Sequence, residues 1–423
     1  MTLDLTENLF DAALSRGNLN AAWKRVRSNK GAAGIDGITI DDFVAYYKGN
    51  GQTLVQAIRT GDYQPYPVKR VFIRKPDGGE RALGIPTVFD RVIQQAIAQI
   101  IGPIFDANFS DFSYGFRPKR SQHDAVKQLQ SYIETGKRIA VDVDLSQFFD
   151  RVNHDLLMTL LGRKIKDKSL LKLIGKYLRT GAIENGCWHE CREGVPQGGP
   201  LSPLLSNIVL DLLDKELEKR NHDFVRYADD FMIIVNSKRA GERVMASITH
   251  FIERKLKLKV NTTKSQVAPI NQCKFLGFTF RGKQLVWLDK VLQQFKCRVR
   301  EITGRSRGIS MERKILELTR YLRGWINYFG IAQGYQKCIE LDHWIRRRLR
   351  MSYWKSWRRV RTKIRNLMRL GVKENLAVQC GCTNKSYWRS SKTEGIHIAL
   401  SNDFFADLGV FSLRDRWVEI HYQ

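Results

Sequence analysis

Apolar positions recur at helical spacing in several parts of the chain, and some of these stretches begin with a capping signal. Thr87 can cap a helix together with Asp90, three residues later, and an apolar stripe follows them. Ser202-Pro203 combines a capping residue with proline at the first helical position. Ser310 precedes another apolar stripe. These patterns predict several amphipathic helices.

Short strands are predicted between the helices. Residues 138–144 are β-branched and end in an acidic residue. Residues 224–227 and 231–235 are apolar and flank the short link Ala228-Asp229-Asp230, which predicts a β-hairpin. Residues 275–280 are expected to begin a second hairpin. This order of strands and helices favours an α+β core over a doubly wound parallel sheet.

The net charge of the chain indicates what kind of partner it binds. The sequence has 71 lysines and arginines against 43 aspartates and glutamates, a net charge of +28. Such a chain attracts polyanions, so nucleic acid is the expected partner. No apolar run approaches the roughly 20 residues of a membrane-spanning helix, and the first residues lack the basic segment of a signal peptide. With seven cysteines and no C-x-x-C pair, we expect a cytoplasmic protein with reduced thiols and no zinc or membrane partner.

The candidate chemistry is a set of carboxylates at strand ends. Asp229 and Asp230 are adjacent in the hairpin link and repel each other unless a cation lies between them. A solvated turn is the ordinary alternative for such a pair. Asp144 ends another apolar strand, and Asp142 could share its face, whereas Asp150 is more typical of a helix start or a salt bridge. Three converging carboxylates would suit two divalent ions that activate a hydroxyl and stabilise a leaving pyrophosphate.

Several motifs together carry a resemblance to a known family. They are Tyr227-Ala-Asp-Asp230, Asp144-Leu-Ser-Gln-Phe-Phe-Asp150, Gln197-Gly-Gly-Pro-Leu-Ser-Pro203, residues 29–37, 114–118, 261–265 and 275–278, and Gly324-Trp-Ile-Asn-Tyr-Phe329. In this order and spacing the set resembles the bacterial group II intron-encoded reverse transcriptase/maturases. The size, and the lack of an H-N-H-type endonuclease with its cysteine pairs, look most like the compact class C members.

The resemblance covers essentially the full chain and implies a right-hand polymerase fold. Its implied parts are an N-terminal extension with a Gly-rich loop (1–40), fingers and a palm with an antiparallel sheet (41–282), a helical thumb or maturase domain (283–370) and a small DNA-binding segment (371–423). The residues themselves predict one helix in the first thirty positions, one basic amphipathic helix over 343–369 and a loop-rich tail from Val372.

The resemblance also implies roles for residues at the carboxylates. Asp144, Asp229 and Asp230 resemble the family's metal-binding triad, with the backbone carbonyl of Leu145 as a further ligand. Two Mg²⁺ ions are the implied cofactor, with Mn²⁺ as the implied substitute. Lys264 resembles a general acid that protonates the departing pyrophosphate, and a surface lysine is the alternative.

Four other positions resemble the family's nucleotide-binding residues. Lys75 and Arg81 flank a predicted turn and are implied to reach the triphosphate, although an exposed basic hairpin is the ordinary alternative. Phe149 is implied to lie under the sugar and exclude a 2′-OH, unless it is simply core. Gln197 precedes two glycines in a loop that the family places beside the nucleotide.

The primer and the nucleic-acid duplex have their own candidate residues. Phe275, Leu276 and Gly277 resemble the primer grip but are equally consistent with a core strand. The basic segment 343–369 suggests phosphate binding, which tolerates any sequence and weakens with salt. The residues chosen for this role are Arg346, Arg347, Arg348, Arg358 and Arg361.

The implied function is that of an RNA-directed DNA polymerase that extends a primer with dNTPs. Its implied partners are an RNA template/DNA primer duplex, the group II intron RNA that it would bind as a maturase in splicing and retrohoming, and target DNA. One alternative is a splicing maturase without polymerase activity. Another is a host-adopted reverse transcriptase in DNA repair or phage defence.

Overall fold

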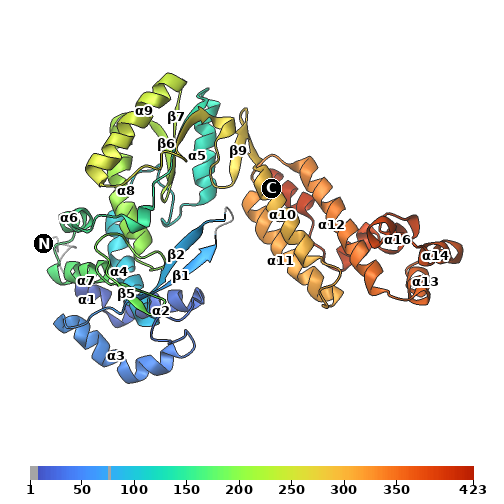
Figure 1. Cartoon of the computed structure of the whole chain (residues 1–423), viewed down its shortest axis with the longest axis horizontal. Helices are drawn as coiled ribbons and strands as arrows, with labels where there is room; N and C mark the ends of the chain where they lie inside the picture. The colour runs from blue at the N-terminus through green and yellow to red at the C-terminus, as the bar shows by residue number, and fades with distance from the viewer. Residues whose placement is uncertain (1–7, 75–77) are drawn as a thin grey trace. The chain divides into compact units, whose positions relative to one another are not determined.

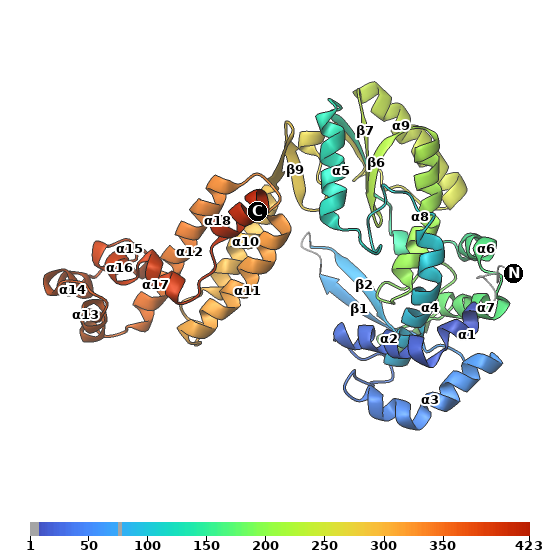
Figure 2. The ribbon, with the colours of Figure 1, turned by 180° about the vertical axis from the view of Figure 1, so that it is seen from behind.

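The structure is a computed structural model that describes residues 8–74 and 78–423. The chain forms two compact units, Met1–Pro269 and Ile270–Gln423, whose elements are labelled in Figure 1 and seen from behind in Figure 2. In the part of the chain that is described, no helix combines the length and apolar character needed to cross a membrane.

A four-stranded antiparallel sheet forms the centre of the first unit. Its order is β6-β7-β3-β8, and its strands are β3 (Ile139–Val143), β6 (Asp223–Tyr227), β7 (Asp230–Val235) and β8 (Gln266–Pro269). The strands alternate in the direction of their side chains. A side chain at Gly241 would meet Val141, Val235 and Val267. The odd-numbered residues of β3 therefore face the helix that carries Gly241, and Asp142 and Asp144 face the other way.

Helices cover this sheet and extend the same core. Figure 1 shows α5, α8 and α9 beside the strands; their bounds and those of the neighbouring helices are α4 (Val88–Asp106), α5 (Gln122–Glu134), α6 (His154–Lys164), α7 (Lys168–Leu178), α8 (Ser202–Lys219) and α9 (Lys238–Phe251), with short turns η1 (Phe148–Asp150) and η2 (Ile252–Leu256). Fully buried side chains such as Ile93, Leu213 and Phe231 join these helices to the sheet in one hydrophobic cluster. The strands at its centre are thus held on a closely packed support.

A second sheet and an N-terminal group of helices complete this unit. The sheet has the order β2-β1-β4-β5, with β1 (Val68–Arg74), β2 (Glu80–Ile85), β4 (Ala182–Glu184) and β5 (Cys187–His189). Strands β1 and β2 form a hairpin in which Ile73 is opposite Arg81. The helices are α1 (Leu9–Ala13), α2 (Arg16–Ser28) and α3 (Phe43–Thr60).

The second unit begins with a small hairpin and is otherwise helical. Its elements are η3 (Ile270–Gln272), β9 (Phe278–Arg281), β10 (Gln284–Trp287), α10 (Asp289–Ile302), α11 (Met311–Phe329), α12 (Tyr335–Ser356), α13 (Val360–Arg369), α14 (Glu374–Gly381), α15 (Tyr387–Ser390), α16 (Glu394–Ala399), α17 (Asn402–Asp407) and α18 (Leu413–Tyr422). The last helix packs on α11 and α12. Its first turn is capped from α12, because the Asp342 carboxylate accepts hydrogen bonds from the backbone N–H groups of Leu413 and Arg414.

The capping signals predicted two of three helix starts correctly. The side chain of Thr87 accepts from the Asp90 N–H, and that of Ser310 accepts from the Arg313 N–H. Ser202, in contrast, is the first helical residue and not the cap. Its hydroxyl donates to the carbonyl of Pro196, because the preceding loop folds back over the helix start.

Three other expectations were wrong in length or kind. The N-terminal residues form two helices that break at Ser15, which caps the second. The basic segment 343–369 is likewise two helices, because the chain leaves helical geometry at Trp357. The tail from Val372 is helical, not loop-rich, since its many serines act as caps of short helices.

Candidate active site

Pairing of the central strands brings the predicted carboxylates together. Val143 of β3 is opposite Phe231 of β7 in an antiparallel register. One residue further, the same register places Asp144 opposite Asp230. Because side chains alternate along β3, Asp142 lies on the same face as Asp144. The pairing of Tyr227 with Asp230 leaves Ala228 and Asp229 as a tight turn at this edge.

The turn depends on an unusual backbone conformation. Ala228 has a φ of 58°, in the left-handed region that disfavours a residue with a side chain. The carbonyl of Ala228 accepts a hydrogen bond of 2.9 Å from Arg226, and the backbone of Gly115 lies directly against the turn. A side-chain carbon at Gly115 would come within 2.2 Å of the Ala228 nitrogen. The strained backbone conformation of the turn is thus stabilised by the residues packed against it.

Arg226 is the centre of a buried polar network below the turn. Its side chain has no exposed surface and forms two hydrogen bonds, of 2.7 and 2.5 Å, with the Asp214 carboxylate. The guanidinium also donates to the Asn207 side chain and the Ser113 hydroxyl. Asn207 in turn donates to the Gly115 carbonyl. The hairpin, helix α8 and the loop before α5 are therefore fixed to one another by a fully satisfied network.

Electrostatics at the carboxylates indicate an uncompensated negative charge. Burial and, to a smaller extent, the charges of three neighbouring carboxylates together raise the pKa of Asp230 to about 7. These belong to Asp142, Asp229 and Asp144. Burial also raises the pKa of Asp142 to about 6 and, with an opposing effect from the positive charge of Arg81, that of Asp229. Like charges held this close favour a bound cation.

The donor set suits divalent cations with oxygen ligands. Carboxylates are hard donors of the kind Mg²⁺ prefers, and Mg²⁺ keeps several waters instead of requiring a complete protein cage. Among the described residues, no group of three or more His, Cys, Asp or Glu side chains is arranged closely enough to hold a metal ion as they stand. The carbonyl of Leu145 accepts no hydrogen bond from the described residues, so it is free to serve as a ligand.

The loop that carries Lys264 is fastened to the backbone of Asp144. The Asp144 N–H donates to the Ser265 hydroxyl at 3.0 Å, and the Asn261 N–H donates to the Asp144 carbonyl at 2.8 Å. Lys264 itself is exposed. Its loop is therefore brought beside the carboxylates by backbone contacts.

Two predicted nucleotide-binding residues line one pocket of about 340 Å³. Phe149 is half-buried there, whereas Phe148 is core and 2% exposed. Gln197 also lines this pocket, and its backbone carbonyl accepts a hydrogen bond from the Gly84 N–H of β2 at 2.7 Å. Phe148 is therefore a core residue, whereas Phe149 packs against the core and also lines the pocket.

The fingers-like hairpin is described only in part. Arg81 is exposed on β2, and its positive charge acts on Asp229, so this strand approaches the carboxylates. Lys75 lies outside the described residues.

Residues 275–277 form a turn in the second unit, and the expected strand begins only at Phe278. Leu276 has a φ of 51° and Gly277 one of 86°. Phe275 is buried, and the Leu276 carbonyl accepts from the Tyr328 hydroxyl at 2.9 Å. The segment 275–278 is therefore fixed to the end of α11.

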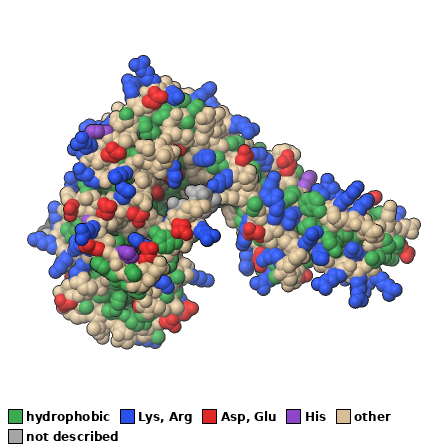
Figure 3. Space-filling view, in the orientation of Figure 1, with side chains coloured by type: hydrophobic (Ala, Val, Ile, Leu, Met, Phe, Trp, Pro, Cys, Tyr) green, Lys and Arg blue, Asp and Glu red, His purple; other side chains and the backbone are tan. Residues whose placement is uncertain are grey.

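The five candidate arginines of the basic segment differ in their surroundings. Arg348 donates to the Thr303 hydroxyl at 2.6 Å and so takes part in the fold. Arg346 and Arg347 are partly exposed and line a pocket. Arg358 and Arg361 are exposed and form no ion pair with any described residue. Lysine and arginine side chains are spread over the visible face of the second unit (Figure 3).

The residues that support this site were not predicted from the sequence. Arg226 is a charged residue inside an otherwise apolar strand, and Asp214 interrupts the apolar stripe of α8. Charged side chains are rarely buried unless they are paired, so these two positions are signals of a buried ion pair. Nothing local in the sequence indicates the role of Gly115, because its neighbour Ala228 is far away in the chain.

Comparison with known proteins agrees with this arrangement. The family profile for reverse transcriptase (RNA-dependent DNA polymerase) matches residues 73–280, and the profile for the group II intron maturase-specific domain matches residues 292–371. The first part of the chain is thus a reverse transcriptase domain, the RNA-directed DNA polymerase class of enzyme. The predicted α+β class is confirmed.

Two curated proteins extend the match. Protein YkfC of Escherichia coli (strain K12) is 36% identical over 299 residues, which cover 61% of this chain and 77% of YkfC. The group II intron-encoded protein LtrA of Lactococcus lactis subsp. cremoris is 32% identical over 329 residues, covering 62% of this chain and 55% of LtrA. The chain thus spans about half the length of LtrA. It belongs to the group II intron reverse transcriptase/maturase family.

A solved structure of telomerase from Candida albicans in complex with a fragment of telomeric RNA is also similar. It is 12% identical, with a TM-score of 0.43, and covers 82% of this chain and 69% of the telomerase chain.

Proposed function

We propose that this chain copies RNA into DNA by adding dNTPs to a primer 3′-OH. The observation that carries the proposal is the strand register that places Asp144 opposite Asp230, with Asp229 in the adjoining turn. In the reaction, the primer oxygen bonds to the α-phosphorus and the bond to the pyrophosphate oxygen breaks.

Asp144, Asp229 and Asp230, with the Leu145 carbonyl, would hold two Mg²⁺ ions, or Mn²⁺ in their place. When bound, these ions supply positive charge that lowers the pKa of the primer hydroxyl and stabilises the departing pyrophosphate. The raised pKa of Asp230, about 7 in the absence of a cation, supports this assignment.

The other residues bind and orient the nucleotide. Arg81 and Lys75 neutralise charge on the triphosphate. Phe149 lies below the sugar and excludes a 2′-OH, while Gln197 and its glycines border the base. Lys264 holds the proton that pyrophosphate takes up on leaving. Support for these roles comes from the shared pocket of Phe149 and Gln197 and from the contact of the Lys264 loop with Asp144.

We also propose that the second unit binds nucleic acid for the maturase function. Residues 283–370 would act as thumb and maturase domain, with Phe275–Gly277 as primer grip, and 371–423 as a DNA-binding segment. Residues 1–40 would form the N-terminal extension and 41–282 the fingers and palm. The partners would be the group II intron RNA, in splicing and retrohoming, and target DNA, as in the compact class C members.

Primer extension on poly(rA)/oligo(dT) with dTTP and Mg²⁺ tests this proposal. We expect synthesis that stops when the metal is chelated and that falls at least about a thousandfold in Asp229→Ala. Asp155→Ala, which removes an exposed carboxylate from α6, is the matched control and should retain synthesis. If the wild-type chain binds and splices intron RNA but makes no cDNA, it is a maturase without polymerase activity and the proposal is wrong.

A further inference from the structure

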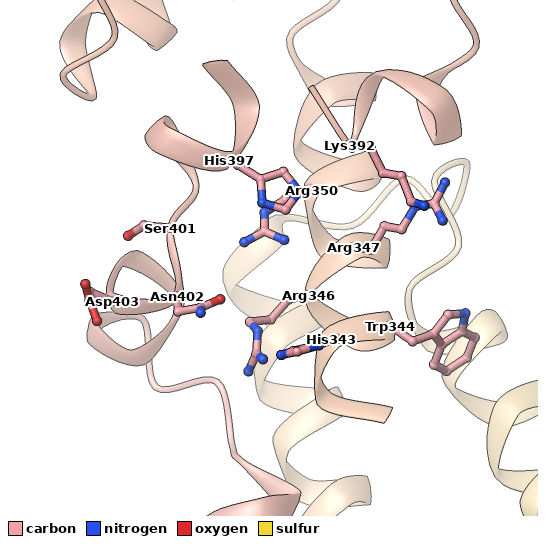
Figure 4. Close-up of a pocket in the computed structure, with 10 residues that line it drawn as sticks. All are labelled: His343, Trp344, Arg346, Arg347, Arg350, Lys392, His397, Ser401, Asn402 and Asp403. Carbon is pink, nitrogen blue, oxygen red and sulfur yellow. The ribbon is translucent and has the colours of Figure 1, made fainter. Parts of the chain in front are cut away.

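A basic pocket of about 880 Å³ lies within the second unit, formed by α12, α16, α17 and nearby loops. Figure 4 shows its lining, which comprises His343, Trp344, Arg346, Arg347, Arg350, Lys392, His397, Ser401, Asn402 and Asp403. Three arginines and one lysine thus face a single aspartate. An excess of positive charge in a concave site is the arrangement that concentrates anions.

Arg350 is the buried member of this group. It is only 5% exposed, and its one hydrogen bond runs from Nε to the Leu400 carbonyl at 2.8 Å. The guanidinium lies 5.6 Å from the centre of the Phe405 ring. No carboxylate among the described residues forms an ion pair with it. A buried charge without a counter-charge is costly, and no described carboxylate offsets this cost for Arg350.

The neighbours of Arg350 add to the unbalanced positive charge of the pocket. Arg346 and Arg350 project from the same face of α12, as expected for residues four apart. Burial and, to a smaller extent, the positive charge of Arg346 together lower the pKa of Arg350 to about 10. The nearby Asp342 carboxylate is already engaged as the cap of α18. His397, drawn beside Arg350 in Figure 4, has a pKa lowered by burial and by the positive charges of Arg350 and Arg347.

Arg347 contributes an unused donor. Its guanidinium stacks on the Trp388 ring at 3.7 Å and donates to the Trp388 carbonyl. The Nε atom is buried and has no hydrogen-bond partner among the described residues. Arg348, the next residue, is directed elsewhere and bonds to Thr303. The four arginines of α12 therefore divide into pocket residues and a structural one.

We propose that this pocket binds a backbone phosphate of single-stranded nucleic acid, with Arg350 at its floor and Arg346 and Arg347 on its walls. The inference rests on the proposed nucleic-acid binding by the second unit and makes it specific. A planar guanidinium with free donors matches phosphate geometry. A regular duplex is a convex rod that would touch only the rim, whereas a flexible strand or strand end can bring a phosphate to the buried floor.

The test measures binding of short fluorescent oligonucleotides to the full chain by anisotropy at fixed salt. The ligands are single-stranded RNA, single-stranded DNA and an RNA/DNA duplex. The variants are Arg350→Gln and, because Arg350 is buried, the partly exposed Arg346→Gln. Arg361→Gln on α13 is the matched control, since it removes the same charge from an exposed site outside the pocket. Circular dichroism checks the fold of each variant.

We expect each pocket variant to weaken single-strand binding by about tenfold, the size of a lost charge-assisted hydrogen bond, and duplex binding by less than about twofold. Arg361→Gln should weaken the binding of single strands and of the duplex by the same factor. RNA and DNA strands should respond equally, because phosphate is common to both; a loss confined to RNA would indicate recognition of the 2′-OH and overturn the phosphate assignment. The proposal is also wrong if the pocket variants behave like Arg361→Gln. If the wild-type chain binds no nucleic acid at all, the proposed binding function itself has failed.

Discussion

Arg226 in the first unit and Arg350 in the second are both buried, but their surroundings differ. Arg226, below the carboxylate turn, is fully buried and has every donor engaged, including two hydrogen bonds to Asp214. Arg350, in the basic pocket, is almost as buried but forms a single hydrogen bond to a carbonyl and no ion pair with any described residue. Arg226 is thus a structural support, whereas Arg350 carries a charge that no described carboxylate pairs.

This difference distinguishes residues that support the fold around a site from residues that are available to bind a ligand. A fully paired network contributes rigidity, and removing one partner leaves the other as an uncompensated buried charge. An unpaired cation lowers stability until an anion arrives, and residues at binding sites commonly carry such a cost. By this criterion Asp230, with its raised pKa, belongs with Arg350, because each lacks a counter-charge from the chain.

The largest effect is expected from Arg226→Ala. The substitution strands the buried Asp214 carboxylate, so we expect the free energy of unfolding to fall by about 3–5 kcal/mol. Urea denaturation measures this loss. Arg192→Ala removes an arginine from the exposed pair with Glu190 and should cost less than about 1 kcal/mol. Equal losses in the two variants would show that the network does not support the fold.

The next effect is expected from Gly115→Ala. The added carbon would clash with the backbone of Ala228 and displace the turn that holds Asp229 and Asp230. A displacement of about 1 Å at reacting groups lowers the rate about a hundredfold, which steady-state primer extension would measure. Gly162→Ala is the matched control, because a side chain there meets nothing within 4 Å. Normal extension by Gly115→Ala would show that the turn position is not critical.

The carboxylate site could be predicted from the sequence because its parts are local. Asp144 ends an apolar strand and Asp229-Asp230 link two others, so the strand pattern suggested where each lies, and the family resemblance implied that they form one site. The basic pocket could not be predicted in this way. Arg346 and Arg350 lie on α12, which ends just before Trp357. His397 lies in the tail, which was expected to be loop. Only packing of short helices, which no local pattern specifies, brings these residues together.

A smaller effect on specificity is expected from Phe149→Ala. If the ring closes the space that a 2′-OH would occupy, its removal should lower the preference for dNTPs over rNTPs by about ten- to a hundredfold. The ratio of incorporation efficiencies for dTTP and UTP measures this, and dTTP incorporation in the same variant is the internal control. An unchanged preference for dTTP over UTP would show that the ring of Phe149 does not exclude the 2′-OH. The pocket shared by Phe149 and Gln197 would then bind something other than the sugar.

The smallest effect, and the one that sharpens the comparison most, is expected from Arg350→Gln without ligand. Glutamine can still donate to the Leu400 carbonyl, and no carboxylate is left unpaired, so the free energy of unfolding should change by less than about 1 kcal/mol. Adding single-stranded oligonucleotide should then raise the unfolding temperature of the wild-type chain more than that of the variant, because a ligand stabilises only the form that binds it. A loss as large as that of Arg226→Ala would instead make Arg350 a structural residue, and the distinction between the two buried arginines would not hold.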